Sequence, residues 1–255
     1  MHYAVIAAGE GARFASEGVT TPKPLLPING QPMIGRLLNL LARHRAQSIS
    51  VIVNEQMRDV ADYVAKWGSE EHLYEMGLPE SFKFHLIVKS TPSSMHSLAT
   101  LAEIMPIGKF CLVTVDAVFD EADFRRYIDT WELTMPQEAD GLLAVTPHVD
   151  DERPLYVDVS GGADGNGTIR GFHDAPLPAA PVFVSGGIYG LDSRTAFPVL
   201  VRCLQEGQSR LRNFQRALVR SGLLLKSWAF DKILDIDHKS DIPKAEQFLT
   251  QRCLK

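Results

Sequence analysis

The sequence predicts an α/β fold, a three-layer αβα sandwich around a mixed, mostly parallel central sheet. Short runs rich in β-branched residues alternate with longer helical patterns from the N-terminus to about residue 146, which is typical of βα units. After about residue 147 glycine and proline clusters separate short strands, which indicates a β-rich elaboration. No internal repeat or low-complexity linker interrupts the chain, so we expect a single domain over residues 1–255.

Strands are expected where β-branched and aromatic residues gather between turn signals. In chain order they are Tyr3–Ala8, Ser50–Asn54, His85–Val88, Phe110–Val115, Gly141–Thr146, Tyr156–Val159, Thr168–Phe172, Phe183–Gly190 and Leu223–Phe230. The glycine-rich loop 161–167 predicts that the strands on either side of it form a hairpin.

Helices are expected where apolar residues recur at helical spacing and a breaker follows. The first has an apolar stripe of Met33, Ile34, Leu37, Leu38, Leu40 and Leu41. The second ends at Gly68, and Pro106 closes the third. The expected helices are Pro32–Arg45, Met57–Trp67, Ser97–Met105, Glu121–Trp131, Thr195–Glu206, Arg210–Ser221 and Ser240–Leu249.

Composition and charge exclude several classes of protein. The 255 residues include 26 Lys and Arg against 31 Asp and Glu, a net charge of −5, so no broad basic surface for nucleic acid is expected. The three cysteines lie far apart without CxxC spacing, which argues against disulfides and structural zinc. We find no signal peptide and no apolar run of about 18 residues, so we expect a cytoplasmic protein without a membrane partner.

The first strand runs directly into a glycine loop, Gly9-Glu10-Gly11-Ala12-Arg13. Bare amide N–H groups beside a guanidinium are suited to a polyphosphate. A dinucleotide-binding loop would place a third glycine where Phe14 stands, although Glu55 offers an acid after the second strand, and a Walker A loop is absent. The loop alone also fits a plain βα turn with a surface arginine.

A second cation follows in a proline frame, Pro22-Lys23-Pro24. Because proline fixes φ and lacks an N–H, we expect Lys23 in an extended loop rather than in a helix or a central strand. A stiff backbone of this kind suits a cation that must be placed in advance of its ligand.

Taken together, these segments resemble a known family. Gly9-x-Gly11-x-Arg13, followed by Pro22-Lys23-Pro24-Leu25-Leu26-Pro27-x-x-Gly30-x-Pro32, is similar to the nucleotidyltransferases that make nucleoside-diphosphate sugars. The resemblance implies a glycosyltransferase-A-like fold, with residues 1–146 as the nucleotide-binding part and 147–255 as the acceptor side with closing helices. It also implies that Ala8, Gly9 and Gly11 bind the nucleotide, and that Arg13 and Lys23 offset charge in catalysis.

Two acidic segments are candidates for a metal site. Asp116 ends an apolar strand, at the edge where open α/β sheets bind ligands, although a turn or cap role would also place an aspartate there. Asp235 and Asp237 face the same side of an extended segment. Asp116 resembles the family's magnesium-binding aspartate, with Val115 replacing its usual glycine, and the family's second ligand matches Asp235 or Asp237. The resemblance thus implies Mg²⁺ as cofactor.

The base and acceptor sites carry weaker patterns. Ser94 and Ser97 resemble the stretch that lines the base pocket, although a helix cap explains Ser97 equally well. Gly187 and Tyr189 belong to a glycine-aromatic strand resembling the border of the acceptor site. The family's Glu-Lys-Pro element reads His173-Asp174-Ala175-Pro176 here, without the lysine, which leaves the acceptor open.

The expected activity is therefore transfer of a nucleotidyl group from an NTP to a phosphorylated acceptor, in the first place a sugar 1-phosphate, with release of pyrophosphate. The alternatives are a cytidylyltransferase for phosphocholine or a polyol phosphate, and a non-catalytic nucleotide-binding protein on the same fold. An NAD-dependent oxidoreductase is disfavoured by Phe14 and by the proline-flanked Lys23. A glycosyltransferase that uses a nucleotide-sugar donor would show two paired aspartates after a mid-chain strand. Asp116 follows such a strand but has no paired aspartate. The base, the acceptor and a homo-oligomeric state stay open.

Overall fold

A computed structural model describes residues 1–135, 139–162, 164–178 and 181–253. The chain divides into two compact units. Unit 1 consists of Met1–Pro106, Val113–Asp116 and Ile236–Lys255, and unit 2 consists of Ile107–Leu112 and Ala117–Asp235. The expected functional division near residue 147 stays a prediction.

Unit 1 is built on parallel strands in the order β5 (Lys83–Val88), β4 (Ser48–Val53) and β1 (His2–Ala7). Every residue of β4 is buried, as expected for a strand covered on both faces. β6 (Lys109–Thr114) ends in this unit, where the N–H of Val115 donates to the carbonyl of Ile6 at 3.1 Å. The ends of β1 and β6 therefore lie side by side.

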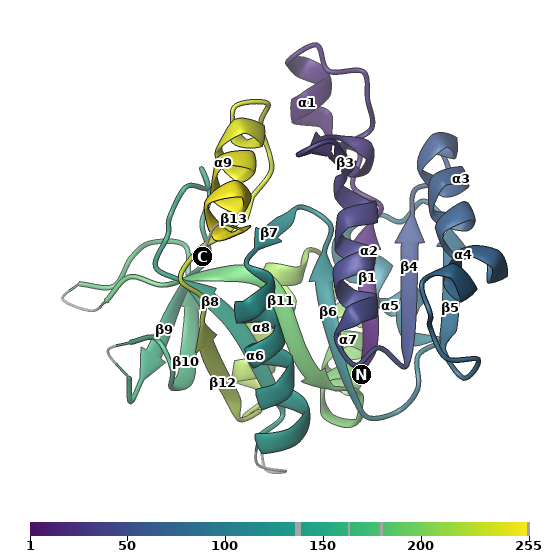
Figure 1. Cartoon of the computed structure of the whole chain (residues 1–255). Coiled ribbons are helices and arrows are strands. Elements are labelled where there is room, and N and C mark those ends of the chain that lie inside the picture. The colour runs from purple at the N-terminus through teal and green to yellow at the C-terminus, as the bar shows by residue number, and fades with distance from the viewer. Residues whose placement is uncertain (136–138, 163, 179–180, 254–255) are drawn as a thin grey trace. The chain divides into compact units, whose positions relative to one another are not determined.

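Helices cover both faces of these strands, with α2 (Met33–Arg43) in front and α5 (Ser94–Ala102) behind (Figure 1). The chain steps outward from β1 to β4 through α2 and back from β5 through α5, so right-handed crossovers require opposite faces. The predicted apolar stripe of α2 is buried in full. The other elements of unit 1 are α1 (Ala12–Ser16), a 3₁₀ turn η1 (Lys23–Leu25), β2 (Pro27–Ile28), β3 (Gln31–Pro32), α3 (Arg58–Trp67), α4 (Glu70–Glu75) and α9 (Asp241–Cys253).

Unit 2 holds a mixed sheet in which β8 and β12 run parallel and the other neighbouring strands run antiparallel. Its strands in spatial order are β11 (Val184–Asp192), β8 (Gly141–Thr146), β12 (Leu225–Ala229), β10 (Thr168–His173) and β9 (Tyr156–Ser160). The predicted hairpin is β9 with β10. A separate short ladder pairs β7 (Ala117–Phe119) with β13 (Ile233–Asp235).

Successive residues of β11 contact helices on opposite faces of this sheet. The N–H of Gly190 donates to the hydroxyl of Tyr127 at 2.6 Å, whereas Tyr189 and Leu191 border the same small cavity as Phe214. The helices are α6 (Glu121–Asp129), which continues into a π-helical turn η2 (Thr130–Thr134), α7 (Ser193–Gln205) and α8 (Leu211–Arg220). Helices on both sides of a mixed sheet confirm the predicted fold class.

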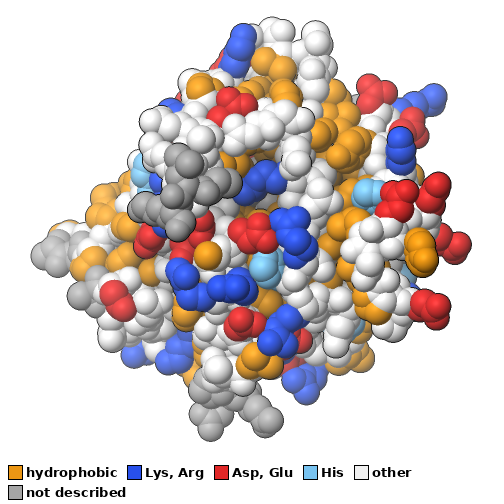
Figure 2. Space-filling view, in the orientation of Figure 1, with side chains coloured by type: hydrophobic (Ala, Val, Ile, Leu, Met, Phe, Trp, Pro, Cys, Tyr) orange, Lys and Arg blue, Asp and Glu red, His pale blue; other side chains and the backbone are white. Residues whose placement is uncertain are grey.

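The surface carries both signs of charge. Figure 2 shows Lys and Arg side chains interspersed with Asp and Glu on the face in view, as the overall balance of charges predicts. Among the residues that the structure describes, no helix combines the length and the apolar character that a membrane span requires.

Candidate active site

A cavity of about 590 Å³ opens in unit 1 where β1 and β6 end. The carboxyl ends of parallel strands are where open α/β sheets bind ligands. Six stretches of the chain line the cavity: the end of β1 with the glycine loop, Lys23 with Pro24, Asn54, residues 91–94 with Ser97, residues 114–116, and Asp237. The structure thus brings together Ala8, Gly9, Gly11, Arg13, Lys23, Ser94, Ser97, Asp116 and Asp237, all predicted from the sequence.

The glycine loop requires glycine at one position. Gly11 has φ +63°, in the left-handed region, and stands immediately before α1. A Cβ at Gly11 would lie 3.1 Å from the Cβ of Lys23, whereas a Cβ at Gly9 would meet nothing within 4 Å. The glycine therefore allows both the turn into α1 and the close approach of Lys23.

We expect Gly11→Ala to lower the free energy of unfolding by about 1–2 kcal/mol, since a left-handed alanine is strained. Gly9→Ala is the matched control and should change it by less than about 1 kcal/mol, since its backbone is not left-handed and its surroundings are open. Urea unfolding of both variants measures the difference. Equal losses would contradict the proposed need for glycine at position 11.

Lys23 begins a 3₁₀ turn, so the expectation of an extended loop was wrong. The N–H of Leu25 donates to the carbonyl of Pro22 at 2.8 Å, and Pro24 lies inside this first turn. Proline is tolerated there because the N–H groups of a first turn have no partner within the helix. The prolines still stiffen the backbone, and the turn directs the lysine side chain into the cavity.

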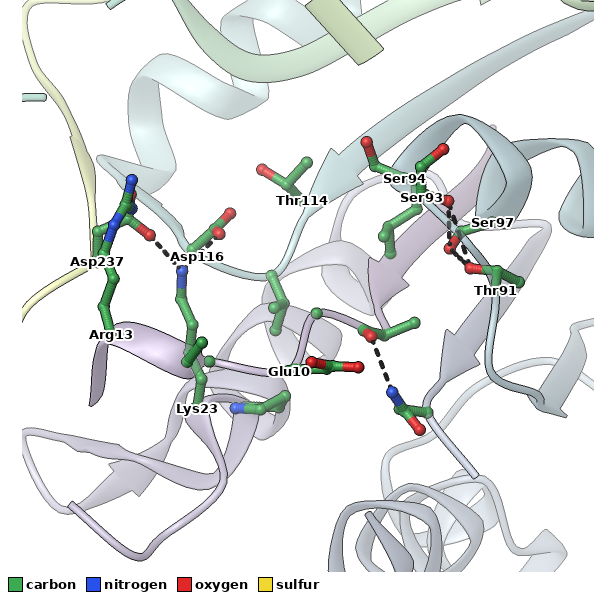
Figure 3. A pocket seen from close by; sticks show the side chains of 18 of the residues that line it. Glu10, Arg13, Lys23, Thr91, Ser93, Ser94, Ser97, Thr114, Asp116 and Asp237 are labelled. Carbon is green, nitrogen blue, oxygen red and sulfur yellow. Dashed lines mark hydrogen bonds and ion pairs between the residues drawn. The ribbon is translucent and has the colours of Figure 1, made fainter. Parts of the chain in front are cut away.

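One end of the cavity is a network of charges (Figure 3). The Nζ of Lys23 donates to Oδ2 of Asp116 at 2.7 Å and to Oδ1 of Asp237 at 2.8 Å. Arg13 also donates to Asp237. The side chain of Lys23 is 10% exposed, and those of both aspartates are 26% exposed. Two cations thus converge on two carboxylates at the floor of the site.

The pKa of Asp116 lies below its ordinary value. Burial raises this pKa, but the Lys23 charge and hydrogen bonds from Lys23 and Thr114 outweigh the effect of burial. Asp116 is therefore an anion at neutral pH, which is the form that binds a cation.

Two carboxylates hold the backbone of Asp237 and of the two residues that follow it. The carboxylate of Asp241 accepts from the N–H groups of Asp237 at 3.1 Å and His238 at 2.8 Å. The carboxylate of Glu17, at the end of α1, accepts from the N–H of Lys239 at 2.8 Å and lies 2.5 Å from Nδ1 of His238. The sequence did not suggest Glu17, because more than 200 residues separate it from His238.

Hydroxyl groups gather at another part of the cavity, away from the charges (Figure 3). The Oγ of Ser97 lies 2.6 Å from Oγ1 of Thr91 and donates to the carbonyl of Ser93 at 3.3 Å. Because α5 begins at Ser94, Ser97 lies inside its first turn instead of starting the helix. Its hydroxyl shapes the segment, while Ser94 also lines the cavity.

Asn54 is a site residue that the sequence did not identify. It follows β4, is 5% exposed, and its Oδ1 accepts from Ser90 Oγ at 2.8 Å and from the N–H of Gln56 at 2.9 Å. Its Nδ2 donates to the carbonyl of Ala8 at 3.4 Å. Asn54 thereby links Ala8, which precedes the glycine loop, to Ser90, which precedes the residues that carry the hydroxyl groups. A polar residue directly after a buried strand was the available signal.

Three predicted site residues belong to unit 2, and their roles stay predictions. Asp235 is exposed and pairs with Ala117 at the end of the ladder between β7 and β13. Gly187 has φ +74° at the irregularity of β11. Tyr189 is 7% exposed, and its hydroxyl accepts from Gln215 at 3.4 Å.

The segment 173–176, which lacks the expected lysine, is contacted by two arginines of helix α8. Asp174 lies 2.6 Å from Nη2 of Arg216 and 3.5 Å from Nη1 of Arg212, both on α8. These arginines lie about 40 residues further along the chain, so the local sequence pattern could not reveal them.

The carboxylates of unit 1 suit a hard divalent cation. Asp116 and Asp237 offer oxygen atoms within 4.8 Å of one another. Mg²⁺ is bound by one or two carboxylates together with substrate phosphates and water. The donor set therefore fits Mg²⁺ chemically.

An α/β sheet with a glycine loop, two cations and two carboxylates at its carboxyl edge is an arrangement suited to phosphate ligands. The model of the MobA-like NTP transferase domain matches residues 3–221. The chain belongs to this family of nucleotidyltransferases.

Curated relatives share parts of the chain. A 2-aminoethylphosphonate cytidylyltransferase of Lancefieldella rimae is 47% identical over 49 residues, 19% of this chain and 20% of the relative. A CMP-5'-(3-aminopropyl)phosphonate synthase of Streptomyces rubellomurinus is 26% identical over 167 residues, 58% of this chain and 24% of the relative. The matches thus span about a fifth and a quarter of the relatives' own length.

Solved structures share the fold over nearly the whole chain. The inositol-1-phosphate CTP transferase from T. maritima is similar with a TM-score of 0.69 and 17% identity, covering 97% of each chain. At this identity the similarity defines the fold only.

Proposed function

We propose that this protein transfers a nucleotidyl group, in the first place CMP from CTP, to the phosphate or phosphonate oxygen of a small acceptor and releases pyrophosphate. The observation that carries the proposal is one cavity with Lys23, Arg13 and two carboxylates at one end and hydroxyl groups elsewhere. Family membership supports the reaction class. The names of the two curated relatives described above and of the T. maritima enzyme support CTP as the donor.

The charged end suits the triphosphate. The N–H groups of the glycine loop and the cations of Arg13 and Lys23 are donors for phosphate oxygens. The hydroxyls of Ser94 and its neighbours suit the polar edge of a base. With the nucleotide in this orientation, the acceptor oxygen attacks the α-phosphorus, the new P–O bond forms, and the bond to the pyrophosphate breaks. The acceptor is already an anion, so no general base is required.

Asp116, together with either Asp237 or Asp235, would hold Mg²⁺. When bound, the ion would offset the negative charge of the two phosphate groups. The chain itself orients the α-phosphorus and offsets charge on the leaving pyrophosphate through Lys23 and Arg13. Catalysis of this kind depends on positioning and on electrostatic stabilisation.

A pyrophosphate-release screen tests the proposal. Each of four NTPs is incubated in the presence of Mg²⁺ with each of four acceptors. The acceptors are 2-aminoethylphosphonate, phosphocholine, inositol 1-phosphate and glucose 1-phosphate. We expect release only when an acceptor is present, and fastest with CTP. Activity with glucose 1-phosphate and UTP would favour the sugar-nucleotide reaction instead. Nucleotide binding without release from any pair would favour the non-catalytic alternative.

A further inference from the structure

Lys23 holds the two carboxylates that the proposed function assigns to a divalent cation. Its Nζ lies 2.7 Å from Asp116 Oδ2 and 2.8 Å from Asp237 Oδ1, and its side chain is largely buried. An ammonium and a divalent cation repel each other and compete for the same oxygen lone pairs. The metal and Lys23 therefore cannot both bind this pair of aspartates at full strength.

We propose that Lys23 is a built-in counter-ion that weakens divalent-cation binding to Asp116 and Asp237 until a nucleoside triphosphate draws its ammonium away. The inference rests on the proposed function, because it assumes that the same cavity binds an NTP. Lys23 becomes a residue that couples the two ligands, in addition to offsetting charge during the reaction.

The surroundings of Lys23 support an exchange of partners. Its backbone is fixed by the 3₁₀ turn, and the Cβ lies close to Gly11, so movement is confined to the flexible stem. The glycine loop lines the same cavity, and phosphate oxygens bound there would offer the ammonium a new partner. The side chain of Arg13, which also pairs with Asp237, is 42% exposed.

Such an exchange couples the two ligands. When the ammonium leaves, Asp116 and Asp237 lose a positive partner and gain affinity for the metal. By linkage, a bound metal raises the affinity for the nucleotide by the same factor. The site would therefore take metal and nucleotide together and bind metal alone weakly.

Mn²⁺ titration monitored by the electron paramagnetic resonance of the free ion tests this without measuring turnover. We expect Lys23→Met to bind Mn²⁺ about 10-fold or more tightly than the wild-type protein in the absence of nucleotide. Lys23→Arg, which retains a cation, is the matched control and should stay within about threefold of the wild type. Circular dichroism establishes that each variant is folded.

A second measurement uses the wild-type protein only. Mn²⁺ binding to the protein is compared with and without CTP. The Mn²⁺ that binds to free CTP is subtracted. We expect tight binding of Mn²⁺ to the protein only when CTP is present. A folded Lys23→Met variant with unchanged Mn²⁺ affinity, or wild-type Mn²⁺ affinity that CTP does not alter once CTP is shown to bind, would overturn the inference. Failure of the proposed function would instead appear as no pyrophosphate from any pair of substrates.

Discussion

Asp116→Asn should lower kcat by about 1,000-fold or more, equivalent to about 4 kcal/mol of transition-state stabilisation. The amide keeps the size of the carboxylate but removes the charge that the lowered pKa of Asp116 maintains at neutral pH. Without it, the charge compensation that a bound cation would supply at the reacting phosphates is lost. Steady-state pyrophosphate release with CTP and the best acceptor measures the effect.

The folded state should tolerate this substitution, because Lys23 still pairs with Asp237. We expect a loss of no more than about 2 kcal/mol in the free energy of unfolding. Asp62→Asn, on the exposed side of α3, is the matched control for removing one negative charge and should leave kcat unchanged. Turnover by Asp116→Asn within about tenfold of the wild type would exclude Asp116 from the reaction.

Lys23→Met should lower kcat by about 100-fold or more, the size of effect seen when one preorganised charged or polar donor is removed from a transition state. Lys23 supplies the most buried cation of the charged end, and no other residue reaches both aspartates in the part of the chain that the structure describes. The KM for CTP should rise as well, since a phosphate contact is lost in the ground state.

Lys66→Met, on the exposed side of α3, is the control for loss of a lysine and should retain full turnover. Single-turnover kinetics at saturating CTP separate the chemical step from binding. If Lys23→Met changed only KM, Lys23 would bind the nucleotide without acting on the transition state, and its catalytic assignment would be wrong.

Much of the fold could be predicted because the sequence patterns repeat at the correct period. The stripe of α2 and the β9 and β10 hairpin followed directly from apolar spacing and from turn residues. The short elements were missed because three to six residues carry too little periodicity. Examples are α4 and the π-helical turn η2 after α6. Lys23 was placed in an extended loop because a proline on each side argues against a helix, although a first turn accepts proline.

The site was only partly predictable. The glycine loop, Lys23 and the strand-end Asp116 are each marked by a local sequence pattern, and all of them line the cavity. Contacts between distant segments have no such mark, as with Glu17 on the His238 segment and Arg216 on Asp174. The direct pairing of Lys23 with both aspartates could not be predicted either, because it depends on how three segments that are far apart in the sequence meet in the folded chain.

The central claim is that an acceptor oxygen attacks the α-phosphorus of a nucleotide bound at this charged end. Parallel reactions with CTP labelled in the α-phosphate or in the γ-phosphate, each with Mg²⁺ and the preferred acceptor, test it most directly. We predict that the α-label appears in the acceptor product and the γ-label in pyrophosphate. Transfer of the γ-label to the acceptor, or release of CDP and inorganic phosphate, would contradict the account.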